Sequence, residues 1–187
     1  MREGEEVRRR RFDQLFRETR ADLLAFLVRR AESLEDAADA LAETYLIVWR
    51  KLDAVPSGRR ARPWLFGVAR NVLLKGMTRR RSHRELVERL AGELRVVAAV
   101  GSERTDPRSD MVRAALARLP DLDREILTLR AWEALSPTEI GVVLGRSANY
   151  VRVRLHRARV RLRRELDEGP PRTSMAVAIA APPRRSS

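Results

Sequence analysis

The chain has 187 residues, of which 44% are hydrophobic and 35% charged, and its formal net charge is +13. This composition is typical of a folded protein, and the charge favours a polyanionic partner, either nucleic acid or an acidic membrane surface. It contains no cysteine, which excludes a disulfide framework and a thiolate metal site. Neither the apolar core of a signal peptide nor a run near the roughly 18 apolar residues of a membrane span is present. We therefore expect a soluble cytoplasmic protein without membrane insertion.

The basic residues divide the chain into parts. Residues 1–80 hold 18 basic and 12 acidic side chains, residues 81–110 hold six of each, and residues 111–187 hold 15 and 8. This pattern predicts two basic domains, 1–80 and 111–168, joined by a neutral linker over 81–110. The first half of the linker could be helical, but its end lacks apolar periodicity and is predicted to be flexible. The proline-bounded tail, 169–187, is predicted to be disordered.

The first domain shows helical spacing throughout. Hydrophobic residues recur every three or four positions from Phe12 to Leu27. Ser33 is the predicted N-cap of a helix over about 34–52, and a Pro/Gly loop over 53–62 follows it. Pro63 then opens another helix. No run alternates with a period of two, so strands are not expected and the predicted fold class is all-α.

The second domain carries stronger boundary signals. Helices are expected near 110–118 and 121–133, with Ser109 and Asp121 as caps. The sequence SPTE from Ser136 combines a serine cap, a proline at the first helical position and a glutamate at the third. That short helix should end at Gly145, with a new helix starting within about three residues. Two helices joined by a glycine-containing turn are typical of a helix-turn-helix.

The last predicted helix is apolar on one side only. Val151, Leu155, Ala158 and Leu162 form a stripe at helical spacing. The arginines lie outside it, at positions 146, 152, 154, 157, 159, 161, 163 and 164. This pattern predicts that the stripe docks on the preceding helix and that the free basic face enters the major groove of DNA.

Three segments resemble one family in its own order. LSPTEIGVVLGRSANYVRVRLHRARVRLR resembles the −35-reading region of bacterial sigma factors of the extracytoplasmic-function (ECF) group. EDAADALAETYLIVWRKLD resembles their polymerase-binding helix, and RPWLFGVARNVLLKGMTRRR their −10-reading helix. The resemblance covers roughly residues 10–80 and 110–166. It implies a transcription initiation factor that binds the beta and beta-prime subunits of core RNA polymerase and recognises −10 and −35 promoter DNA. It also implies regulation by an anti-sigma factor.

The resemblance assigns polymerase binding to three acids. Asp39 and Glu43 match contacting positions, and Asp36 lies one turn earlier on the same face. The residues alone would favour a merely solvated acidic face. Ala42 stands where the family usually has glutamine, so one contact would be missing here.

The resemblance also assigns −10 recognition. Asn71 matches a position that reads an unpaired base, with Arg70 and Lys75 near phosphates. The loop before this helix lies where the family captures a flipped base, and its arginines supply the charge. Trp64 either stacks on a base or belongs to the core. The predicted −10 set is Arg59, Arg60, Arg62, Trp64, Arg70, Asn71 and Lys75.

For the −35 element, the resemblance places Arg152, His156 and Arg157 at bases or adjacent phosphates. Arg154 and Arg159 are predicted phosphate partners. Asn149, Tyr150 and Val153 replace the usual glycine, threonine and serine, so the promoter sequence that is read should differ. The predicted −35 set is Arg146, Asn149, Tyr150, Arg152, Val153, Arg154, His156, Arg157 and Arg159.

The sequence contains little that would support an enzymatic function. The two histidines, His83 and His156, lie far apart, and the chain shows no phosphate-binding loop, metal spacing or nucleophile elbow. No enzyme, cofactor or metal is therefore expected. A stand-alone dimeric helix-turn-helix repressor or activator is the alternative, and a polyanion-binding structural protein is a third. Neither explains the acidic face of the first domain, nor why that domain carries a basic helix in addition to the one in the second domain.

The linker also limits the distance between the domains. Promoter elements two duplex turns apart are separated by roughly 70 Å. Residues 82–110 could span about 95–105 Å when extended, but only about 30 Å on average as a coil. The free domains should therefore lie close together, with their DNA-binding faces partly hidden.

Overall fold

The computed structural model describes residues 2–91 and 107–167, and all regular structure in these ranges is helical. The first lobe contains α1 (Arg2–Val28), α2 (Leu34–Arg50) and α3 (Ala61–Ala91). The second lobe contains α4 (Pro107–Arg118), α5 (Asp121–Ala131), α6 (Pro137–Leu144) and α7 (Ala148–Asp167). The predicted all-α fold is thus confirmed. The end of the predicted linker and the predicted tail lie outside the described residues.

The first lobe packs three helices around a shared core. Ser33 caps α2 as predicted, with its Oγ accepting from the Asp36 amide at 3.0 Å. Phe26 of α1 and Phe66 of α3 are both fully buried and meet edge to face, with ring centroids 5.0 Å apart. Two short 3-10 turns, Leu52–Ala54 and Gly58–Arg60, occupy the predicted loop. Helix α3 begins at Ala61, which leaves Pro63 in the first turn, where a missing amide costs little.

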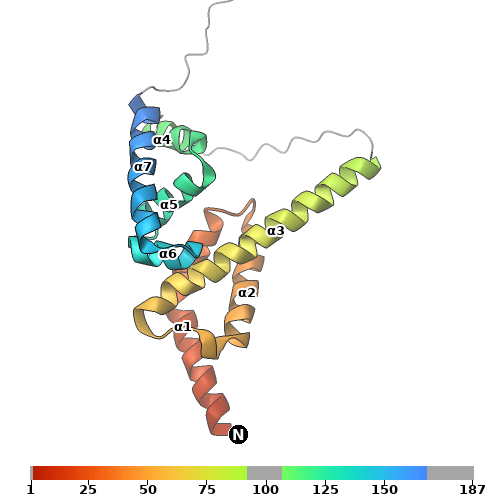
Figure 1. Cartoon of the computed structure of the whole chain (residues 1–187). Coiled ribbons are helices and arrows are strands. Elements are labelled where there is room, and N and C mark those ends of the chain that lie inside the picture. The colour runs from red at the N-terminus through yellow and green to blue at the C-terminus, as the bar shows by residue number, and fades with distance from the viewer. Residues whose placement is uncertain (1, 92–106, 168–187) are drawn as a thin grey trace, which may run out of the picture.

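Helix α3 extends into the first half of the predicted linker, the part whose sequence allowed a helix. It continues without a break through residues that we assigned to the linker and ends at Ala91. The residues of α3 that are described as buried lie in its first half, and its second half extends away from both lobes (Figure 1). The interval between the described helices is therefore 92–106, shorter than the predicted linker.

The capping box at Ser136 and two glycines, Gly141 and Gly145, determine the local structure of the helix-turn-helix. The Ser136 Oγ accepts from the Glu139 amide at 3.3 Å, while Glu139 accepts from the Ser136 amide at 2.7 Å. The Ser136 hydroxyl also donates to the Glu139 carboxylate at 2.6 Å. This bond, together with the one from the Ser136 amide, holds the pKa of Glu139 below its usual range. Gly145 ends α6 with a φ of +63°, as glycine does most readily. A side chain on Gly141 would bring its Cβ within 2.5 Å of the Arg146 carbonyl oxygen, so the turn requires glycine there.

Two predicted caps of the second lobe are not found. Pro120, rather than Asp121, precedes α5, and Asp121 lies in the first helical turn, where it pairs with Arg124. An acid in the first turn is favourable because it faces the positive end of the helix dipole. Helix α4 begins at Pro107, before the predicted cap at Ser109. No helix in the described ranges is long and apolar enough to cross a membrane.

The capping box gives a stability prediction. Replacing Ser136 with Ala removes the hydrogen bond to the Glu139 amide and should lower the free energy of unfolding by about 1 kcal/mol. Denaturant titration of the full chain measures this change. Thr138→Ala, at an exposed position two residues further on, is the matched control and should have a smaller effect. Equal losses in the two variants would contradict the capping role.

Candidate nucleic-acid interface

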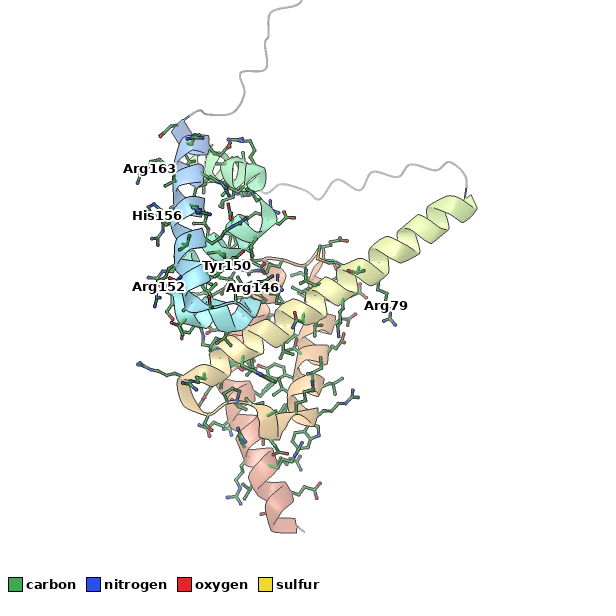
Figure 2. All side chains as sticks on the ribbon, viewed as in Figure 1. Arg79, Arg146, Tyr150, Arg152, His156 and Arg163 are labelled. Atoms are coloured by element: carbon green, nitrogen blue, oxygen red, sulfur yellow. The ribbon has the colours of Figure 1, made fainter. Side chains whose placement is uncertain are left out.

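Helix α7 presents a basic face to solvent. Three residues of its predicted stripe, Val151, Leu155 and Ala158, are buried, and the fourth, Leu162, is half-buried. Arg152, His156 and Arg163 lie along the edge of the second lobe away from α3 (Figure 2). Ser147 caps the helix by accepting from the Tyr150 amide at 3.2 Å. Most of the predicted −35 residues are exposed on or beside this helix: Arg146, Asn149, Tyr150, Arg152, Val153, His156, Arg157 and Arg159. We call this set the outer face of α7.

Arg154 differs from the rest of the predicted −35 set. It is half-buried and forms an ion pair with Asp123 of α5, which is completely buried. Arg161 donates to the other oxygen of the same carboxylate. A buried carboxylate requires such partners because desolvation penalises its charged form. Both arginines therefore attach α7 to α5, and the Arg154 guanidinium is engaged within the lobe.

The predicted polymerase-binding acids are not equivalent. Asp39 and Glu43 are exposed on α2, whereas Asp36 is half-buried and paired with Arg80 of α3. All three border a groove between α2 and α3 whose apolar floor includes Val72. Asp39 and Glu43, hereafter the acidic pair, are thus available to a basic partner, while the charge of Asp36 is neutralised within the lobe.

The predicted −10 residues divide into exposed and covered members. Arg59, Arg60, Asn71 and Lys75 are exposed. Trp64 is half-buried and packs against the core, which supports the core alternative for this residue. Arg62 and Arg70, which are also half-buried, reach across the boundary between the lobes.

Arg62 and Arg70 bind groups of the second lobe. Arg62 donates to the Glu133 carbonyl oxygen at 3.1 Å, and its Nε lies 2.9 Å from Asp22. Arg70 donates through two nitrogens to both carboxylate oxygens of Glu125, one at 2.8 Å. The hydrogen bond to Glu125 raises the pKa of Arg70. Paired fork-like bonds of this kind are among the stronger ones in proteins, so these two cations are occupied while the lobes are docked.

Further contacts complete the boundary between the lobes. The Glu133 carboxylate is 3% exposed and accepts from Arg29 at 2.7 Å and Arg30 at 3.1 Å, both directly after α1. Burial lowers the pKa of Arg30, and the nearby Glu133 opposes that shift. Helix α6 lies against α3, where a Cβ on Gly67 would be 3.5 Å from the Val143 backbone (Figure 1). The lobes therefore lie close together, as we predicted from the average span of the linker.

The sequence did not reveal the acids at this boundary. Glu125 and Glu133 belong to a short segment without a motif, and they pair with residues 55 or more positions away. Asp123 of the same segment was not predicted either, and it pairs within the second lobe, with Arg154 and Arg161. Only the fold brings such charges together. Within the described ranges, no cluster of three or more potential metal ligands occurs.

Known proteins share this architecture. The family described as "Sigma-70 region 2" matches residues 15–85, and "Sigma-70, region 4" matches residues 109–162. The RNA polymerase sigma factor CnrH of Cupriavidus metallidurans is 31% identical over 143 residues, covering 71% of this chain and 74% of CnrH. The ECF RNA polymerase sigma factor SigM of Bacillus subtilis is 27% identical over 158 residues, or 84% and 96% of the two chains. The chain belongs to the ECF sigma factors.

A solved structure supports the same fold. The sigma factor RpoE of Bartonella quintana, in complex with the anti-sigma factor NepR, aligns with a TM-score of 0.60. The identity is 24%, and the alignment covers 83% of this chain and 96% of RpoE. The matches to region 2 and region 4 fall in the first and second lobes of this chain, respectively.

Docking of the lobes can be tested at Gly67. A Cβ at Gly67 would already touch the Val143 backbone, at 3.5 Å, and a leucine adds three further carbon atoms beyond it, so Gly67→Leu should separate α6 from α3. Because the chain lacks cysteine, dye labels can be placed on cysteines introduced at positions 75 and 152. Energy transfer between them should fall in Gly67→Leu.

Gly76→Leu is the matched control, since a Cβ there meets only the end of the Arg80 side chain, at 3.6 Å. Both variants add the same side chain to the same helix. Equal energy transfer in the two variants would show that the close approach of α3 and α6 does not hold the lobes together.

Proposed function

We propose that this sigma factor binds core RNA polymerase through the acidic pair of α2 and reads promoter DNA with both lobes. The outer face of α7 reads the −35 duplex, while α3 and the arginines before it read the −10 element. The observation that carries this assignment is the solvent-exposed basic face of α7 opposite its buried stripe. Such a helix, placed second in a helix-turn-helix, suits the major groove. The factor supplies no catalysis and acts in the cytoplasm by positioning the polymerase.

The first lobe argues against a stand-alone repressor or activator. Asp39 and Glu43 are exposed one turn apart, in a chain with a large excess of positive charge. An acidic surface on a DNA-binding protein repels DNA and favours a basic protein partner. Core polymerase, through its beta and beta-prime subunits, is the partner that we propose. Asp36, held by Arg80, would orient α2 rather than contact the polymerase.

The acidic pair gives the first functional prediction. Changing Asp39 and Glu43 together to Arg should abolish co-purification with core polymerase, because complementary charge becomes repulsive. Glu5→Arg combined with Glu18→Arg makes the same charge change at exposed positions of α1 and should leave co-purification intact. Polymerase binding by the Asp39/Glu43 variant at the control level would refute the assignment.

DNA reading by α7 divides between base and phosphate contacts. Arg152 lies near the start of the helix, the part that such motifs direct at base edges. Arg159 is exposed two turns further on, where a guanidinium suits phosphates. Since Arg154 is paired with Asp123, Arg159 is the better phosphate candidate of the two.

These two roles predict different losses on substitution. Arg152→Ala should weaken binding to a −35 duplex by about 1–3 kcal/mol and relax specificity at one base pair. Arg159→Ala should weaken binding to all duplexes alike and reduce the magnitude of the salt slope by about one. Salt titrations on matched and scrambled duplexes measure both effects. The same behaviour in both variants would contradict the division.

Reading of the −10 element requires the lobes to separate. Arg62 and Arg70 are paired with Glu133 and Glu125 while the lobes are docked, so their positive charge is not available to single-stranded DNA. We propose that the polymerase holds the lobes apart at the promoter. The structure of RpoE with NepR supports an anti-sigma factor as a further class of partner.

A further inference from the structure

Two exposed valines interrupt the basic face of α7. Val153 and Val160 are 46% and 50% exposed and are absent from the core cluster. At 3.6 residues per turn, both lie roughly opposite the buried stripe that contains Val151 and Leu155. The side of α7 opposite the buried stripe is therefore apolar at its centre, although arginine and histidine side chains lie on either side of the two valines. Packing within the described lobes does not account for either valine.

Position along the helix distinguishes the two valines. Val153 lies in the second turn of α7, between Arg152 and His156, in the part of a recognition helix that meets base edges. Val160 lies seven residues further on, roughly 10 Å along the axis. A helix that enters the groove by its N-terminal turns would bring Val153 to the bases and leave Val160 near the backbone.

The chemistry of valine limits what Val153 can recognise. Its side chain neither donates nor accepts a hydrogen bond, so it cannot bind a phosphate or pair with a polar base edge. The apolar group that the major groove offers is the C5-methyl of thymine. A β-branched side chain also has one strongly preferred rotamer in a helix, which fixes its two methyl groups in advance.

We propose that Val153 recognises the C5-methyl group of one thymine in the −35 element and so specifies a T·A pair in one orientation. Arg152 and His156 beside it would bind polar edges of neighbouring bases. This inference rests on the proposed function, because it takes α7 to be the −35-reading helix.

Uracil provides a direct test, since it differs from thymine only by lacking that methyl group. The full chain is used to select a preferred duplex from a randomised pool, which is feasible because the outer face of α7 is exposed in the docked arrangement. Each thymine of the selected duplex is then replaced by uracil in turn. Loss of one buried methyl group should weaken binding about three- to fivefold at a single position.

Two valine variants locate the contact. Val153→Ala should bind the thymine and uracil duplexes equally well at that position. Val160→Ala removes the same atoms from an equally exposed site on the same face and should keep the preference for thymine. Both variants should fold, because alanine is favourable at exposed helical positions.

The inference is overturned if no thymine is sensitive to uracil replacement, if the sensitivity survives Val153→Ala, or if Val160→Ala abolishes it. Any of these results, together with weakened duplex binding by Arg152→Ala, would leave the proposed function standing. Failure to select any sequence, with or without core polymerase, would overturn both the inference and the proposed function.

Discussion

The carboxylate of Glu133 holds a central place in this structure. It is nearly fully buried and is bound by Arg29 and Arg30, which follow α1. A buried charge is tolerated only when it is paired, and loss of one partner leaves the other uncompensated at a cost of several kcal/mol. The interaction ties the segment between α5 and α6 to the first lobe. It thereby supports the close approach of α6 to α3 at Gly67.

The docked arrangement affects the functional surfaces unequally. Arg62 and Arg70 of the −10 set are engaged by the second lobe, whereas the outer face of α7 and the acidic pair are exposed. The expectation that both DNA-binding faces would be partly hidden therefore holds for only one of them. The reason is geometric, because α6 rather than α7 lies against α3 (Figure 1). Both of these surfaces are therefore accessible to solvent while the lobes are docked.

Arginine serves several physical roles in this chain, and its abundance does not distinguish them. Arg152 and Arg157 are exposed on the outer face of α7. Arg154 and Arg161, from the same helix, neutralise the buried Asp123. The planar guanidinium suits both uses, since it pairs with a carboxylate as readily as with a phosphate or a base edge. Which use applies depends on what lies opposite the side chain in the folded lobe.

The amino-acid sequence by itself determined the helical fold, the capping box at Ser136, the glycine that ends α6 and the buried stripe of α7. These features rest on interactions within a few residues or on the period of one helix, so local order is sufficient to predict them. The outer face of α7 follows from the same periodicity. Only the tertiary structure decided the pairing of Arg62 and Arg70 with the second lobe, of Arg154 with Asp123, and of Asp36 with Arg80. Each of these pairs joins residues more than 30 positions apart, and a single charged residue carries no signal of which distant partner the fold will place beside it.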